Sequence, residues 1–294
     1  MWQVTPAFET LFLVFVVAFG LVFGSFANVV IYRLPRRESI VRPRSRCPSC
    51  GSAIRWYDNI PLVSWFVLGA RCRDCGEPIS WRYPAVEAAS GLLFLLAGVR
   101  FGLDLRTPVT CFLFWMLLVL SVIDIDMMRL PNPLVALTAA AGGVLALVSQ
   151  FADVELAPLV GVARQGALSQ PLLAALFGVA LGVGSTLLIS GMYALLRGKQ
   201  GLGMGDVKLL GALGPFLAGY VIFAFLVGSL LGTLAVVFGQ VAVRVSGRAG
   251  AEGQTAGRAL RDMVIPFGPF IALGGALAVL VGPEVVAWYV GIIT

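Results

Sequence analysis

Long stretches without a charged residue constrain this chain more than any other feature. Asp, Glu, Lys and Arg are all absent from residues 10–32, 130–152, 165–196, 209–243 and 263–283. A helix needs about 20 apolar residues to cross a bilayer. Charged residues make up 12% of the chain, whereas soluble domains contain roughly 25%. The sequence therefore predicts an all-α polytopic membrane protein.

The number of spans follows from the lengths of these stretches. Residues 209–243 are too many for one span at about 1.5 Å per residue, and the Gly and Pro residues of GPFLAGY (214–220) favour a break between a short helix and a longer one. We expect about eight transmembrane helices, at residues 9–32, 84–101, 107–126, 131–150, 171–196, 206–218, 220–243 and 264–290. The first has no basic segment before it and no cleavage motif, which favours an anchor over a removed signal peptide.

Arg and Lys predict the orientation of these helices, because cytoplasmic loops are rich in them. Residues 33–83 alone hold ten of the 21 basic residues. If this segment is cytoplasmic, so are the loops that carry Arg129, Arg197, Lys199, Lys208, Arg244, Arg248, Arg258 and Arg261, and only Arg100, Arg106 and Arg164 lie outside. Both termini then face outward. The net charge of +6 reflects this topology, so we expect membrane lipid and no nucleic acid as a partner.

Four cysteines dominate the one sizeable polar segment, residues 33–83, which we call the cysteine module. Cys47, Cys50, Cys72 and Cys75 form two CxxC pairs, each followed by Gly. Four thiolates at this spacing suit a closed, structural, tetrahedral zinc site. The segment is too small to fold on a hydrophobic core alone, so a bound metal ion would stabilise it. Two disulfides or four idle thiols are the alternatives, and a reducing cytoplasm argues against disulfides. We expect a small cytoplasmic zinc-ribbon-like insertion after a first transmembrane helix at residues 1–32.

Carboxylates are the remaining candidates for chemistry, because the chain has no histidine. Ionisable groups within spans are costly and are candidates for function. Four qualify by position, Glu87, Asp124, Asp126 and Asp206, all near the predicted cytoplasmic side. Acids that merely flank helices are the alternative. Asp124 and Asp126 lie about 200° apart on a helix, so only one faces a given cavity, and spacing does not show which.

Two carboxylates that meet in an apolar site share one proton, because both cannot ionise easily. The ionised member deprotonates water while the protonated one polarises an amide carbonyl, which is aspartic-protease chemistry. Asp206 follows the glycine-rich stretch GLGMGD (201–206). Glycines permit close approach by an extended peptide, and a helix N-terminus favours a negative charge.

These residues together resemble the bacterial type IV prepilin peptidases, which are GxGD membrane aspartic proteases. The matching motifs cover nearly the whole chain in family order: GSFANVVIYRLP (24–35), the two CxxC pairs around NIPLVSW (59–65), RYPAVE (82–87), IDIDMMRLPN (123–132), GMGDVKLLGALG (203–214) and IPFGPF (265–270). One position departs, since Asn132 stands where the family commonly has Asp. This departure leaves the two candidate catalytic aspartates untouched.

The resemblance implies a function and a site. Such enzymes remove the short basic leader of type IV prepilins or type II secretion pseudopilins after a Gly, at the cytoplasmic face of the bacterial inner membrane. Many then N-methylate the new terminus with S-adenosylmethionine. The resemblance assigns catalysis to Asp124 and Asp206 and makes residues 84–294 the transmembrane peptidase domain. The residues that bind the methyl donor stay unknown. Glu87 is a candidate for methylation, and an acid at a helix start is the alternative.

Other functions remain open from the residues alone. A GxGD protease with another substrate class would share the same aspartates. If the chain were a non-enzymatic transporter with buried acids, we would expect acids near the midplane and inverted repeats. If it were a membrane-anchored zinc-ribbon adaptor, the D-x-D and GxGD motifs would have no explanation. Lys208 is either a positive-inside anchor or a group that tunes the aspartates or meets an acidic residue of the substrate.

Overall fold

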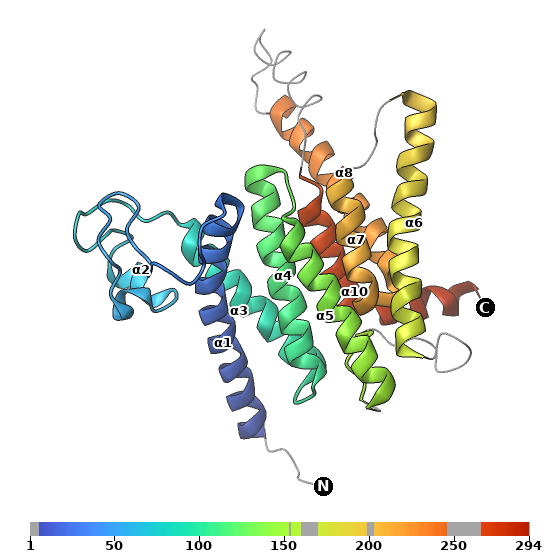
Figure 1. Ribbon diagram of the computed structural model, residues 1–294, viewed down its shortest axis with the longest axis horizontal. Coiled ribbons are helices and arrows are strands. Elements are labelled where there is room, and N and C mark those ends of the chain that lie inside the picture. The colour runs from blue at the N-terminus through green and yellow to red at the C-terminus, as the bar shows by residue number, and fades with distance from the viewer. Residues whose placement is uncertain (1–5, 153, 160–169, 199–202, 246–265, 294) are drawn as a thin grey trace.

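Eight long helices form the bundle seen in the computed structural model, which describes residues 6–152, 154–159, 170–198, 203–245 and 266–293 (Figure 1). The helices are α1 (Pro6–Arg33), α3 (Arg82–Phe101), α4 (Arg106–Met127), α5 (Asn132–Phe151), α6 (Pro171–Arg197), α7 (Met204–Leu217), α8 (Val221–Val245) and α10 (Gly268–Ile293). The described residues include no strand. The predicted all-α architecture is confirmed.

Seven segments of the described residues are long and apolar enough to cross a membrane, and one of them, Met204–Val241, contains both α7 and α8. The predicted division of this stretch into a short and a longer helix is therefore confirmed. The short helix, predicted at 206–218, continues through Pro215 as expected and ends one residue earlier, at Leu217. Pro215 lacks the N–H that would bond to the preceding turn, and the chain then turns at Ala218, whose φ is 47°.

Some residues used in the sequence interpretation lie outside the described part of the chain. They are Arg164, Lys199, Gly201, Arg248, Arg258, Arg261 and the first residue of the IPFGPF motif, Ile265.

Small residues bring two pairs of helices into backbone contact, as is common between helices in membranes. On α6 and α7, a Cβ added to Gly214 would lie 2.3 Å from the backbone nitrogen of Val179. On α1 and α3, a Cβ added to Gly24 would lie 2.6 Å from the Cα of Glu87, and the Ser90 hydroxyl donates to the carbonyl of Gly20 at 2.7 Å. These contacts hold α7 against α6 and α3 against α1.

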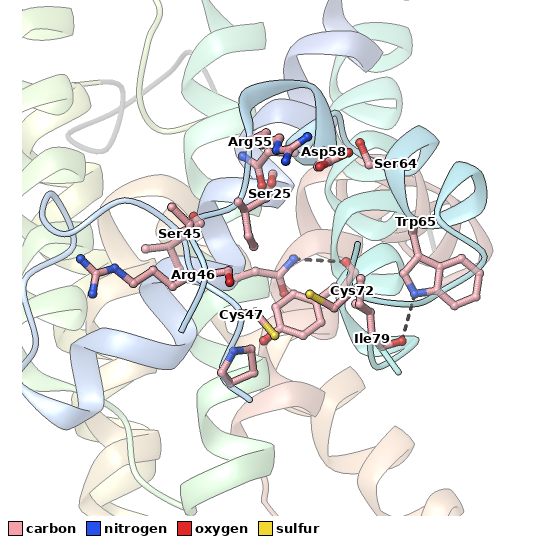
Figure 2. Close-up of a pocket in the computed structure, with 18 of the residues that line it drawn as sticks. Ser25, Ser45, Arg46, Cys47, Arg55, Asp58, Ser64, Trp65, Cys72 and Ile79 are labelled. Atoms are coloured by element: carbon pink, nitrogen blue, oxygen red, sulfur yellow. Dashed lines mark hydrogen bonds between the residues drawn. The ribbon is translucent and has the colours of Figure 1, made fainter. Parts of the chain in front are cut away.

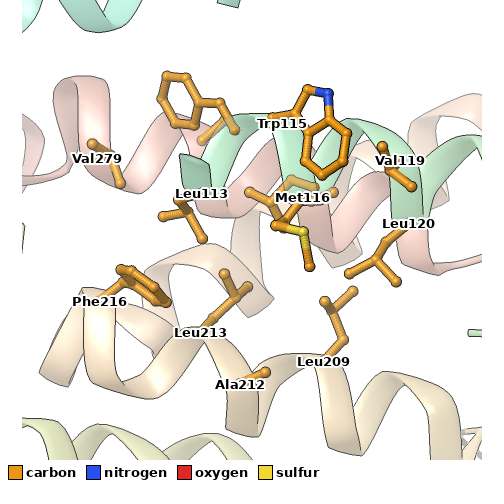
Figure 3. Close-up of a cluster of buried hydrophobic side chains, with 14 of the residues drawn as sticks. Leu113, Trp115, Met116, Val119, Leu120, Leu209, Ala212, Leu213, Phe216 and Val279 are labelled. Carbon is orange, nitrogen blue, oxygen red and sulfur yellow. The ribbon is translucent and has the colours of Figure 1, made fainter. Parts of the chain in front are cut away.

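The main core packs α4 against α7 and α10 (Figure 3). Apolar side chains of α4, among them Leu113, Met116 and Leu120, face Leu209 and Leu213 of α7 and are completely or almost completely buried. Cys111 of α4 is also buried, as expected for a thiol used as an apolar filler. Because α4 is covered by its neighbours, its last turn places Asp124 inside the bundle.

The cysteine module lies beside the end of α1, at the left of Figure 1. Its only α-helix is the short α2 (Val63–Val67), preceded by a 3₁₀ turn, η2 (Trp56–Asn59). Two isolated bridges, Arg46 with Ala53 and Arg71 with Pro78, close the two cysteine turns. With so little regular structure, the module depends on its turns and on the cysteine cluster for its shape.

Candidate active site

Asp124 lies in the last turn of α4 and is 6% exposed. Its Oδ2 accepts a hydrogen bond of 3.0 Å from the backbone N–H of Gly268, the first residue of α10. A Cβ added to Gly268 would lie 2.6 Å from the same oxygen, so a side chain there would displace the carboxylate. The N-terminus of α10 thus points at a carboxylate, an arrangement that favours negative charge.

Asp206 lies in the first turn of α7, directly after the glycine-rich stretch. Its backbone N–H donates to the carbonyl of Gly203 at 3.1 Å, and a Cβ on Gly203 would lie 3.3 Å from the Asp206 Oδ2. Gly205 lies against Leu130 of the loop between α4 and α5, since its Cβ would be 3.5 Å from that side chain. The chain segments that follow Asp124 and precede Asp206 therefore touch.

Asp124 and Asp206 lie close enough to interact electrostatically. The bundle brings them together from two helices that are 82 positions apart in the sequence. Both are at helix ends rather than in the middle of a span. A transporter that carries its acids at the midplane would place them differently. We call Asp124 and Asp206 the aspartate pair.

Asp126 points away from the aspartate pair. It is exposed, and its Oδ2 accepts a short hydrogen bond from the guanidinium of Arg82 in the first turn of α3. This ion pair joins the start of α3 to the end of α4. The D-x-D motif thus contains one carboxylate directed into the bundle and one directed to a neighbouring helix at the surface.

Lys208, two residues after Asp206, extends away along the surface of α7. Its Nζ donates to the Oδ1 of Asn132 at 3.0 Å, and the contact is exposed. Asn132 is the position at which the family commonly has Asp. An aspartate there would turn this hydrogen bond into an ion pair, so the departure weakens one link between α5 and α7 without touching the aspartate pair.

The four cysteines of the module come together in one cluster, with all four sulfurs within 4.8 Å of one another. The Sγ atoms of Cys47 and Cys75 are 3.9 Å apart. Thiolates around a tetrahedral zinc ion lie about 3.8 Å from each other, because each Zn–S bond is about 2.3 Å. The cluster could therefore hold a metal ion.

The two halves of the cluster have the same turn geometry. The N–H of Gly51 donates to the Cys47 carbonyl at 2.9 Å, and the N–H of Gly76 donates to the Cys72 carbonyl at 3.0 Å. Both glycines have positive φ, 73° and 72°, a conformation that favours Gly. This requirement explains why each CxxC pair is followed by Gly.

Hydrogen bonds within the module stabilise the Cys50 thiolate and hold the loops together. Hydrogen bonds from Ser52 lower the pKa of the Cys50 thiol to about 6, which favours the form that binds metals. Arg73 forms two hydrogen bonds to Asp58, of 2.8 and 2.6 Å, and these hold the pKa of that carboxyl below its usual range. The second cysteine turn is thereby tied to the loop between the two CxxC pairs.

Glu87 does not join the aspartate pair. It is buried in the second turn of α3, and its Oε2 accepts a hydrogen bond of 2.8 Å from the backbone N–H of Leu62 in the cysteine module. Of the four carboxylates selected by position, the structure brings two together, pairs one with Arg82 and places the last against the module.

Two residues next to these carboxylates had no role in the sequence interpretation. Gly268 belongs to the motif IPFGPF and Arg82 to the motif RYPAVE, but neither motif indicates by itself which aspartate its residue meets.

Comparison with known proteins gives the same family over the same regions. Residues 18–101 match the family model described as the bacterial peptidase A24 N-terminal domain, and residues 111–237 match the type IV leader peptidase family. Three relatives named prepilin leader peptidase/N-methyltransferase illustrate the similarity. The Myxococcus xanthus protein is 40% identical over 235 residues, which cover 77% of this chain and 64% of that protein.

The match to other relatives extends over almost their whole length. The Stutzerimonas stutzeri protein is 33% identical, with 92% of this chain and 91% of the relative covered. The Pseudomonas aeruginosa protein is also 33% identical, with 95% and 93% covered. No solved structure matches the chain. On the motifs, the two family matches and these relatives, the chain belongs to the type IV leader peptidase family.

Proposed function

We propose that this chain is a membrane aspartic endopeptidase that removes the leader of type IV prepilins or type II secretion pseudopilins after a Gly. Asp124 and Asp206 carry the reaction. One observation supports this assignment above all others: two carboxylates from the ends of different helices interact at one end of the bundle, and one of them accepts the N–H of Gly268.

The chemistry needs only groups that the chain itself supplies. The aspartate pair shares one proton, since two carboxylates in an apolar site do not both ionise easily. The charged member takes a proton from water, which attacks the carbonyl carbon of the scissile amide. The protonated member donates to the carbonyl oxygen and stabilises the charge that develops there. The chain contains no histidine, so no triad or histidine relay competes with this mechanism.

The same chain also methylates the new N-terminus, in this proposal. The support is the name that its relatives carry, prepilin leader peptidase/N-methyltransferase. The methyl donor is S-adenosylmethionine. Methyl transfer to an amine requires that the amine lose its proton.

A structural zinc ion completes the proposal. Cys47, Cys50, Cys72 and Cys75 fit it, because their sulfurs cluster at distances suited to tetrahedral coordination. Four protein ligands leave no open position for a substrate, so the ion stabilises the module and takes no part in catalysis.

The protein resides in the bacterial inner membrane as a multi-pass protein with its active site at the cytoplasmic face. The excess of Arg and Lys in residues 33–83 supports this orientation. The aspartate pair lies at the end of α4 and the start of α7, the same end of the bundle at which α1 enters the module (Figure 1).

Co-expression tests the proposed cleavage directly. A prepilin with a Gly-Phe leader junction is expressed with the chain, and its mobility and N-terminal sequence are determined. We expect a shortened product that begins at Phe. An unchanged prepilin in the presence of membrane-inserted, folded enzyme would contradict the proposal. A transporter or an anchored adaptor would give that result.

A further inference from the structure

The longest uncharged stretch of the cysteine module, residues 59–70, contains no Asp, Glu, Lys or Arg. It includes the motif NIPLVSW (59–65), which has no role in the proposed cleavage reaction. The stretch is too short to cross a bilayer, which takes about 20 residues. Apolar segments of roughly 10–14 residues are typical of a buried helix or of a segment that lies in the membrane interface. The exposure of its side chains distinguishes these two cases.

The helix in this stretch, α2, presents apolar side chains outward. Val63, Phe66 and Val67 are 54%, 71% and 73% exposed. Residues spaced by three and four positions lie on one face of a helix, and we call these three residues the α2 face. A helix at the surface of a soluble domain normally presents polar residues outward. The α2 face is therefore suited to an apolar environment that the module itself does not provide.

The other side of α2 is fastened to the module. Ser64 is buried, and its hydroxyl accepts from the N–H of Ile60 and donates to the carbonyl of Tyr57, both at 2.9 Å. The Nε1 of Trp65 donates to the carbonyl of Ile79 at 3.1 Å (Figure 2). These bonds hold α2 in one orientation, so the α2 face points away from the module.

The residue before α2 places this helix beside the uncharged part of α1. The N–H of Leu62 donates to the Oε2 of Glu87 at 2.8 Å, and a Cβ on Gly24 of α1 would lie 2.6 Å from the Cα of Glu87. Gly24 precedes the end of α1 at Arg33 by nine residues, which is about 13 Å along the helix axis. Figure 1 shows α2 lower than the end of α1 at which the module begins. The α2 face therefore lies at the depth of the membrane-spanning segments.

Aromatic and basic side chains border the stretch on both sides. Trp56 and Trp81 are both exposed, and tryptophan is enriched where a membrane meets water. Arg55 and Arg71, at either end of the stretch, are also exposed, and basic residues beside an apolar helix face attract anionic lipid headgroups. The order of basic, aromatic and uncharged residues matches the layers of a bilayer leaflet.

We propose that α2 is an interfacial membrane anchor, which inserts Val63, Phe66 and Val67 among the acyl chains of the leaflet beside α1. Phospholipid occupies the α2 face, because the ends of the module continue directly into α1 and α3 and because the face lies at the depth of those helices. The bilayer then holds the module at a third point and keeps Leu62 against Glu87. This anchoring requires that α1 and α3 span the membrane and does not depend on the assignment of catalysis to the aspartate pair.

Fluorescence quenching by lipids tests the depth of Phe66. A genetically encoded fluorescent amino acid replaces Phe66 in the full-length chain, which is reconstituted with phospholipids brominated in their acyl chains. Phe15, an exposed residue in the uncharged part of α1, is the reference for a position in the membrane. Val41 is the matched control, because it is also apolar and exposed but lies in the loop that binds Arg33 at the end of α1.

We expect the probe at position 66 to be quenched at least half as strongly as the probe at position 15, and the probe at position 41 to be quenched far less. Helical circular dichroism equal to that of the wild type shows that each labelled protein is folded. Quenching at position 66 no stronger than at position 41 would overturn the anchor. A probe at position 66 that is shielded from water but not quenched would also overturn it, since a protein would then cover the α2 face.

A charge on the α2 face tests whether this face carries the insertion. With the probe at position 66, Val67→Asp should lose most of the quenching, because a carboxylate among acyl chains is costly. Val41→Asp, the matched control, adds the same charge at the end of α1 and should keep the quenching. Equal quenching in the two variants would contradict insertion of α2 through this face.

Discussion

One backbone group, the N–H of Gly268, holds the Asp124 carboxylate. The N–H of Gly268 reaches its Oδ2 at 3.0 Å, and a methyl group at position 268 would overlap that oxygen at 2.6 Å. The contact joins α4 to α10 across 144 positions of sequence. It fixes the direction of one member of the aspartate pair, and catalysis by positioned groups is sensitive to displacements of about 1 Å.

Gly268→Ala should therefore impair cleavage while the protein still folds. We expect a loss of about 10²-fold in kcat/KM, because the added Cβ displaces the Asp124 carboxylate. The rate is measured on a synthetic prepilin peptide with purified enzyme. Gly184→Ala is the matched control, since a Cβ there meets nothing within 4 Å. Equal activity of both variants would show that the Gly268 contact does not position Asp124.

The sequence alone could not choose between Asp124 and Asp126. Helical geometry separates them by about 200°, but which of the two faces inward depends on partners far along the chain. Gly268 lies 144 positions from Asp124, and Arg82 lies 44 positions from Asp126. The family resemblance predicted Asp124, and its buried position agrees with that choice. The catalytic role itself stays a prediction.

At the scale of elements, the cysteine module shows what sequence spacing predicts well. Two CxxCG units specify two turns with glycine at positive φ, and the structure contains both. The spacing gave no indication of the contact between the module and α3, in which the N–H of Leu62 donates to Glu87. The division of the chain at residues 32 and 83 stays a prediction.

Cys72→Ser should remove the zinc ion and loosen the module. We expect about one zinc per chain in the wild type and almost none in the variant by elemental analysis, because a structural zinc site needs all four ligands. Protein yield should fall, and residues 45–80 should become sensitive to protease. Cys111→Ala, which changes a buried thiol of α4 outside the cluster, should keep its zinc. Full zinc content in Cys72→Ser would contradict the four-cysteine site.

The sequence predicted the break between α7 and α8 but not the exact residues at which the two helices end and begin. The stretch GPFLAGY predicted two helices that part between residues 218 and 220, and the chain turns one residue earlier, at Ala218. The close approach of Gly178 and Gly214 to each other's helices holds α7 against α6 up to this turn. Tertiary packing therefore decides the last residues of the helix.

At the scale of the whole molecule, the cysteine cluster and the aspartate pair belong to different parts of the chain. The cluster lies in the module beside α1, and the aspartate pair lies at the ends of α4 and α7. The sequence predicted the membrane architecture because uncharged length is a strong constraint on a bundle. It could not predict which helix is central, which depends on the packing of α4 against α7 and α10.

This separation predicts that cleavage survives mild chelation. Incubation with a chelator that leaves the module folded, as judged by protease resistance, should leave the cleavage rate within about twofold of the untreated enzyme, because proton transfer by the aspartate pair needs no metal. Serine-directed reagents should also have no effect. Immediate loss of cleavage with an intact module would assign the enzyme to a metal-dependent class.

The most direct test of the central claim is the cleavage rate of Asp124→Asn, Asp206→Asn and the double variant, with Asp126→Asn as the matched control. Asparagine keeps the shape of the side chain but takes no proton from water. We expect each single variant to lose at least about 10²–10⁴-fold and the double to be no worse, because members of one catalytic unit are not additive. Asp126→Asn, which loses only an exposed ion pair worth about 0–1 kcal/mol, should keep most of its activity. Cleavage by both Asp124→Asn and Asp206→Asn, or inactivity of Asp126→Asn alone, would contradict the assignment.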